Sequence, residues 1–397
     1  MSIISNAFLS TEALRRIPAR YTTTLVLLAF LAALISGTPG IAAEESEEAR
    51  TIPNEKCLGC HDDPELTNDA GESMAVLADA FSASKHRRLD CVDCHTDALT
   101  VRHPRNDLGP VKVESCQGCH AEEIEALSTS VHAPEQGSAA RCGTCHGNVH
   151  TLPRRTDILT DPLSAVNQTA VCGQCHQEMM EGYLHSEHAR ALLVAGLTSA
   201  PACTDCHGTH GILPQSNPES RTSQLHNPET CGSCHELILV HWRDESTHGT
   251  LWEAGEDGPV CTTCHEAHDV VDPTGIEVRA QFPHECANCH EEYNESFHDS
   301  FHGKASELGF RQAAICSDRH TPHQNLPASD PRSSIHPDNL DETCGACHDN
   351  VNASFLTFDP HNDPTNPEDN LWVYVIWVFM TGLLLGVFGF FGLHDFL

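Results

Sequence analysis

Residues 57–61 read Cys57-Leu58-Gly59-Cys60-His61, and this Cys-x-x-Cys-His pattern occurs ten times in the 397-residue chain. The paired cysteines are Cys57, Cys60, Cys91, Cys94, Cys116, Cys119, Cys142, Cys145, Cys172, Cys175, Cys203, Cys206, Cys231, Cys234, Cys261, Cys264, Cys286, Cys289, Cys344 and Cys347. The histidines that follow them are His61, His95, His120, His146, His176, His207, His235, His265, His290 and His348. Every one of the 21 cysteines except Cys316 lies in such a motif, so the pattern organises most of the chain.

The chemistry of the motif points to covalent haem. Its two thiols bond to the vinyl groups of a porphyrin, and the adjacent histidine becomes an iron ligand. A zinc half-site or a redox dithiol also uses Cys-x-x-Cys, but neither requires a histidine directly after each second cysteine. All ten copies have that histidine, although only 29 of the 397 residues are His. The sequence therefore predicts ten haem c groups.

Composition indicates how such a chain folds. Hydrophobic residues make up 39% and aromatic residues 6%, which is too little for a large apolar core. We expect the porphyrins to fill the interior and the chain to be mainly irregular with short α-helices, because no sustained alternating segment predicts a sheet. Folding should then depend on haem insertion, as small metal-bound domains depend on their metal.

The motifs fall into pairs. First cysteines of alternate motifs are 59, 56, 59, 55 and 58 residues apart, which predicts a repeat of about 57 residues with two haems each. Between its two motifs a unit carries a Ser-x-His element, and its second motif is followed by a further histidine. The histidines of these two kinds are His86, His132, His188, His248 and His302, and then His150, His210, His268 and His323.

These additional histidines are candidate second axial ligands. Only Met74, Met179 and Met180 lie in the expected mature ectodomain, so histidine should supply the second ligand and give low potentials. The less regularly placed histidines are weaker candidates, and which histidine caps which iron is left open. These weaker candidates are His226, His284, His336 and His361, followed by His103 and His241.

One position departs from the pattern. Where the fifth unit should have its second motif, the chain reads Cys316-Ser317-Asp318-Arg319-His320, with arginine in place of the second cysteine. Two interpretations stand beside each other: an eleventh haem held by Cys316 and His320, or a site that holds none.

The two ends of the chain suggest its location. Three arginines precede the apolar run Leu25–Ile35, and small residues follow it, so we expect a secretory signal peptide at 1–43. Residues 44–366 form the predicted ectodomain. Residues 371–393 are uncharged and long enough for a transmembrane helix, and 394–397 would be a short cytoplasmic end of a truncated chain. This predicts the periplasmic side of a bacterial inner membrane, with a single C-terminal anchor.

Charge restricts the partners. Twenty-two basic residues against 56 acidic ones give a formal charge of −34, which is the wrong sign for nucleic acid. An acidic surface instead favours basic redox proteins.

The motif array, the linker at 359–364 and the ending Phe390-Phe391-Gly392-Leu393-His394 resemble bacterial membrane-anchored multihaem cytochromes c. In that family the anchor often continues into a cytochrome b module similar to the thiosulfate reductase b subunit, which is absent here. The resemblance implies electron exchange with a membrane cytochrome b or quinol-oxidising partner.

Two functions compete at this point. The first is electron transfer through bis-His haems between a quinone-linked membrane partner and periplasmic or extracellular redox proteins. The alternative is a multihaem oxidoreductase that reduces a small nitrogen or sulfur oxyanion, which would need one iron with an open coordination position. The sequence names no catalytic residue and leaves open whether the chain is an enzyme.

Overall fold

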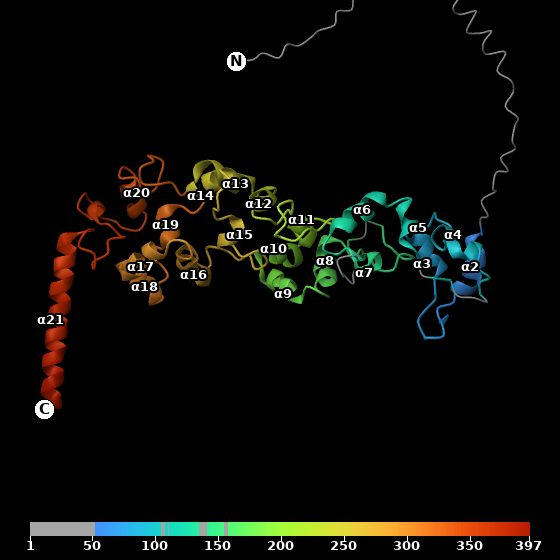
Figure 1. Ribbon diagram of the computed structural model, residues 1–397, viewed down its shortest axis with the longest axis horizontal. Helices are drawn as coiled ribbons and strands as arrows, with labels where there is room; N and C mark the ends of the chain where they lie inside the picture. Colours follow the sequence, from blue (N-terminus) through green and yellow to red (C-terminus); the bar gives the residue numbers. More distant parts are fainter. Residues whose placement is uncertain (1–51, 105–107, 110, 135–140, 155–157) are drawn as a thin grey trace, which may run out of the picture. The chain divides into compact units, whose positions relative to one another are not determined.

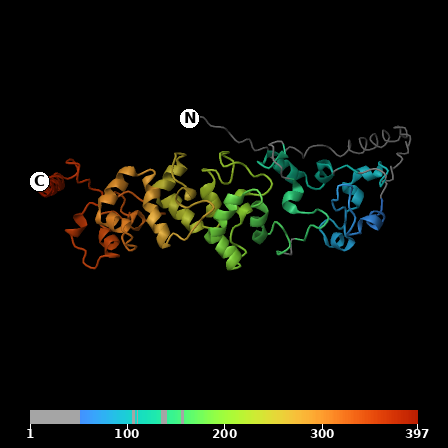
Figure 2. The same ribbon diagram turned by 90° about the horizontal axis from the view of Figure 1, so that it is seen from below.

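The computed structural model describes residues 52–104, 108–109, 111–134, 141–154 and 158–397. The predicted signal peptide lies outside these ranges. The unit Pro53–Leu397 contains almost all of them (Figures 1 and 2).

Short helices and turns build this unit. The helices are α2 (Asn54–His61), α3 (Ala78–Ala83), α4 (Cys91–Cys94), η1 (Thr96–Leu99), α5 (Val113–Gln117), α6 (Ala121–Thr129), α7 (Cys142–His146), α8 (Ala165–Cys172), α9 (Gln177–His185), α10 (Glu187–Ala189), η3 (Arg190–Val194), α11 (Cys203–His207), α12 (Asn227–Gly232), α13 (Glu236–Glu245), α14 (Thr247–Glu253), α15 (Cys261–Cys264), α16 (Ile276–Ala287), α17 (Glu291–Asp299), α18 (Phe301–Glu307), α19 (Cys316–His320), α20 (Leu340–Gly345), η4 (Phe355–Thr357) and α21 (Leu371–Phe396). In the described ranges the β-structure is one isolated bridge between Thr67 and Ser73. The prediction of short helices without a sheet is confirmed.

The second motif of each pair forms a turn of helix by itself, as in α7 and α11. The third motif residue caps this turn. Its Asp or Thr side chain accepts a hydrogen bond from the backbone N–H just before the motif, for example Ala202 N to Asp205 Oδ2 at 2.7 Å. The same bond joins Val260 N to Thr263 Oγ1 at 3.0 Å. Because Asp and Thr satisfy a free N–H at a helix start, this residue fixes the turn locally.

First motifs use a different local structure. In the second to fifth units their histidine is the N-cap directly before the next helix, as His176 is for α9, His235 for α13 and His290 for α17. Each of these helices ends just before a serine. The motif histidine and the Ser-x-His element thus stand at the two ends of one short helix.

The serine joins two helices. Ser186 Oγ donates to Tyr183 O of α9 at 2.7 Å and accepts from Ala189 N of α10 at 3.1 Å. Ser246 makes the equivalent bonds to Trp242 O and Gly249 N between α13 and α14. A serine at the N-cap satisfies an otherwise unpaired N–H, and here it also sets the angle between the helices. The histidine two residues later is thereby held in one place.

Apolar packing is sparse. Within the described residues, the buried apolar side chains include few large ones, and the one cluster they form is Leu192 with Ala200 and Ala202. Tyr183 packs on this cluster, and its hydroxyl donates to Pro201 O at 2.9 Å. The side chains alone make only a small core.

The last helix, α21, has a different character. It has 26 residues with a mean hydropathy of 2.2 in its most apolar window, and none of that window is buried. Within the described part of the chain it is the helix long and apolar enough to cross a membrane.

Candidate haem sites

Each of the ten motif histidines lies opposite one other histidine. The pairs are His61–His103, His86–His120, His95–His150, His132–His176, His146–His210, His188–His235, His207–His268, His248–His290, His265–His323 and His302–His348. Their ring centroids are 5.9–6.3 Å apart. No pair is repeated, so every motif histidine has its own partner.

This spacing fits one iron between two imidazoles. A metal–nitrogen bond is roughly 2 Å, and the ring centre lies about 1 Å beyond the nitrogen, so two rings on one metal have centres about 6 Å apart. The observed distances agree with that value for all ten pairs. Two neutral histidines can lie this far apart without a metal, so the support comes from the recurrence of the distance in all ten pairs.

The partners come from neighbouring units in a regular way. A Ser-x-His histidine faces the first motif of the following unit, as His188 faces His235. A histidine just after a second motif faces the second motif of the preceding unit, as His210 faces His146. His61 is the exception among the ten because its partner, His103, belongs to the same unit.

A backbone hydrogen bond accompanies this exchange. The donor is the N–H of the residue after the serine of the Ser-x-His element. The acceptor is a carbonyl in the next unit, two residues after the histidine that follows the second motif of that unit. Glu187 N donates to Val270 O at 2.7 Å, and Val131 N donates to Ile212 O at 2.8 Å. The same bond links Lys85 to Leu152 and Thr247 to Asn325. Each of these bonds therefore joins two segments that carry histidines opposite different motifs, as the bond from Glu187 does for His188 and His268.

Some histidines have their second nitrogen engaged. His61 Nδ1 lies 2.8 Å from Met74 O, and His86 Nδ1 lies 3.2 Å from Val149 O. Donation to a backbone carbonyl fixes the proton on Nδ1, which leaves Nε2 free as a metal ligand.

The cysteines also come together in a regular order. The first cysteines of the two motifs in a unit lie side by side, as Cys172 does with Cys203 and Cys231 with Cys261. The hydrogen bond from Cys203 lowers the pKa of Cys172 to about 7, and the same contact raises the pKa of Cys203. Cys206 in turn lies near Cys231 of the next unit. Porphyrins attached at these positions would therefore be neighbours in chain order.

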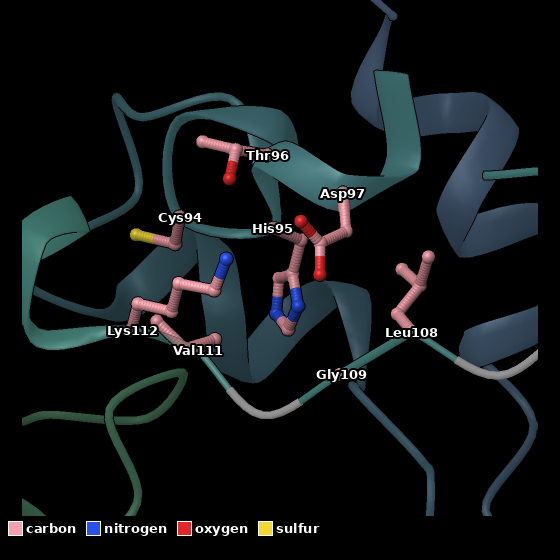
Figure 3. Close-up of a pocket in the computed structure, with 8 residues that line it drawn as sticks. All are labelled: Cys94, His95, Thr96, Asp97, Leu108, Gly109, Val111 and Lys112. Atoms are coloured by element: carbon pink, nitrogen blue, oxygen red, sulfur yellow. The ribbon is translucent and has the colours of Figure 1, made fainter. Parts of the chain in front are cut away.

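The surface beside His95 shows how such a ring is presented. Figure 3 shows the His95 ring in a shallow hollow formed by residues 94–97 and by Leu108, Gly109, Val111 and Lys112, with the Asp97 carboxylate close by. Burial lowers the pKa of His95, and the neighbouring His61 and His103 rings add to this effect. A neutral imidazole is the form that binds a metal.

Not every candidate histidine is in a pair of this kind. His226 lies 3.1 Å from Glu229, and His241 lies 2.8 Å from Glu245. His336 lies near Asp338, and His284 faces His298, which is not a motif residue. His103 and His361, weak candidates in the sequence, lie opposite His61 and His320.

A zinc interpretation fits the structure less well. Across the described ranges, no three His, Cys, Asp or Glu side chains gather as a site for a bare metal ion, whereas structural zinc needs four ligands. The donors instead come as two imidazoles facing each other, with a nearby pair of thiols. That arrangement suits a covalently attached haem.

This combination of short helices, recurring Cys-x-x-Cys-His turns and facing histidines defines a multihaem c-type cytochrome. Comparison with known proteins agrees. A model of the family described as cytochrome c7 and related cytochrome c matches residues 103–177. The multiheme cytochrome MtrA of Shewanella baltica (strain OS185) is 26% identical over 233 residues, covering 55% of this chain. The chain spans 65% of the length of that relative. The chain binds haem c and is a multihaem c-type cytochrome.

Proposed function

We propose that this chain is a membrane-tethered electron carrier in which ten bis-His haems c form a path for electrons. One observation carries the proposal: each of the ten motif histidines has a second histidine at the spacing of two ligands on one iron. An iron with two imidazole ligands has no position for a substrate, so it exchanges electrons only.

The order of the haems follows from the repeat. In units of about 57 residues, haems of one unit are neighbours through their first cysteines. Haems of successive units are neighbours because Cys94, Cys145, Cys206 and Cys264 lie near enough to Cys116, Cys172, Cys231 and Cys286 to interact electrostatically. Each unit also supplies ligands to the next. Such a chain transfers electrons along its sequence order and is tuned by ligands, hydrogen bonds and the acidic surface.

The competing function is reduction of a small nitrogen or sulfur oxyanion at an open haem. Carbon monoxide distinguishes the two, because it binds ferrous haem only where a ligand position is free. We expect the reduced full-length protein to show no carbon monoxide binding at any of the ten haems. Binding of one equivalent in the wild-type protein would favour the oxidoreductase.

Location is part of the proposal. An N-terminal signal peptide would export residues 44–366, and α21 would hold them at the periplasmic face of the inner membrane. Electrons would pass between a quinone-linked membrane protein and periplasmic or extracellular partners whose contact surfaces are basic.

The anchor can be tested by truncation. We expect a chain ending at Asn370 to move from the membrane fraction to the soluble fraction with its haem content unchanged, because the apolar surface of α21 is lost. Haem staining of the two fractions measures this. A truncated protein that stayed with the membrane would assign the attachment to another segment.

A glycine tests the positioning of one ligand. A Cβ on Gly249 would lie 2.0 Å from Trp242 O and 2.6 Å from Arg243 Cα, both backbone atoms. Gly249→Ala should therefore push α14, which carries His248, away from His290, at a cost of about 1–3 kcal/mol. We expect one haem in ten to gain high-spin character in its optical and electron paramagnetic resonance spectra. Gly382→Ala in α21 is the control, since its Cβ would meet nothing within 4 Å and it lies outside every haem motif. Equal spectra for both variants would contradict the packing argument.

A further inference from the structure

The segment Cys316-Ser317-Asp318-Arg319-His320 folds as an intact second motif does. It forms the helical turn α19, and Ile315 N donates to Asp318 Oδ2 at 2.8 Å, as Ala202 N does to Asp205 in α11. Directly after this turn Thr321 has a positive φ of 45°, as Gly147 and Gly208 have after α7 and α11, but its ψ of 95° differs from their −156° and −169°. A β-branched residue rarely adopts this conformation. The backbone is therefore that of a haem-attachment turn despite Arg319.

The histidine of this segment also has a partner. The ring centroids of His320 and His361 are 6.1 Å apart, within the range of the ten intact pairs. Ser296 Oγ donates to Tyr293 O at 3.0 Å and lies 3.0 Å from His361 Nδ1, so it accepts the Nδ1 proton. His361 Nε2 is then the nitrogen left for a metal. The Tyr293 ring packs edge-on against His361 at 5.0 Å and holds its plane.

The single cysteine lies where an attachment cysteine belongs. Cys316 is hydrogen-bonded to Cys286, as Cys203 is to Cys172 and Cys261 is to Cys231. The fourth position of the turn is taken by Arg319, whose carbonyl accepts a hydrogen bond from Ser334 Oγ. The segment therefore has every group of a second-motif haem site except the second cysteine thiol.

We infer that Cys316, His320 and His361 hold an eleventh haem, attached by one thioether bond. The inference rests on the proposed function, since it extends the same kind of site. In the attachment step the Cys316 S–H adds across one vinyl C=C of the porphyrin. The sulfur bonds to the inner vinyl carbon, the hydrogen goes to the outer one, and nothing leaves. The second vinyl group, next to Arg319, stays unreacted.

This haem would close a gap in the path. The site of His290 precedes it through the Cys286–Cys316 contact. Arg319 and Asp318 lie near enough to His302, the partner of His348, to influence its pKa. The eleventh haem would therefore lie between the haem at His290 and the haem at His348.

Intact mass under denaturing conditions tests the inference, because only covalently bound haem stays with the polypeptide. We expect eleven haem masses on the wild-type chain and ten on Cys316→Ser. Arg319→Cys should keep eleven, and the reduced pyridine derivative should lose the long-wavelength shoulder that one unreacted vinyl group gives the wild type. Ten haems on both wild type and Cys316→Ser would overturn the eleventh site and leave the proposed function intact. Fewer than ten on the wild type would count against the proposed function itself.

The distal ligand has its own test. In the full-length protein, His361→Ala should open one iron and give one equivalent of carbon monoxide binding. His336→Ala, whose ring lies near Asp338 rather than opposite a motif histidine, should give none. The absence of carbon monoxide binding by His361→Ala would remove His361 from the site.

Discussion

Produced without haem attachment, the full-length chain should lose most of its helical circular dichroism signal outside α21. Apart from α21, the described helices have at most 12 residues, and isolated helices of that length are marginal in water. Ordering each residue costs about 1–2 kcal/mol, which the sparse buried side chains around Leu192 cannot offset. The porphyrin faces and the iron–histidine bonds must supply the difference.

The comparison requires the same chain with and without its haems. We expect the haem-loaded protein to resist a protease under conditions that degrade the haem-free chain within residues 53–370. A haem-free chain that kept its helical signal and unfolded cooperatively would contradict this explanation of the fold.

Replacing a single histidine in the middle of the chain should open one iron. His188 is the second residue of α10 and lies opposite His235, with ring centroids 6.2 Å apart. In His188→Ala the His235 haem would keep one protein ligand, so the reduced protein should bind one equivalent of carbon monoxide where the wild type binds none. Electron flow between the two ends should slow as well, because the altered haem has neighbours on both sides.

His226→Ala provides the matched control. His226 is near the same unit boundary, but its ring lies beside Glu229 instead of a motif histidine. We expect its spectra and carbon monoxide binding to match the wild type. Equal carbon monoxide binding by the two variants would show that the facing rings are not iron ligands.

The sequence predicted much of this arrangement because the chemistry is local. Two thiols and a histidine within five residues specify haem attachment wherever they occur, and the short helices follow from the low apolar content. The Ser-x-His histidines are recognisable because a serine recurs two residues before each of them, and Ser186 and Ser246 cap the helices that carry His188 and His248. Their role as ligands stays a prediction.

The pairing could not be read from the sequence. It depends on contacts between units about 57 residues apart, such as the hydrogen bond from Glu187 N to Val270 O. His103 is a weak candidate from the sequence because it lies eight residues after His95, whereas His210 and His268 lie three residues after their motifs. The regularly placed histidines number nine for ten motifs, so a partner for every motif requires one histidine from elsewhere. His361 is a weak candidate from the sequence because it lies in the linker before α21.

An electron cryomicroscopy map of the haem-loaded full-length protein tests the central claim most directly. We predict an iron between the two rings of each of the ten pairs, with ligands supplied by successive units as in His188–His235 and His146–His210. A map in which a motif iron is bound by a different histidine, or has an open position, would contradict the proposed path.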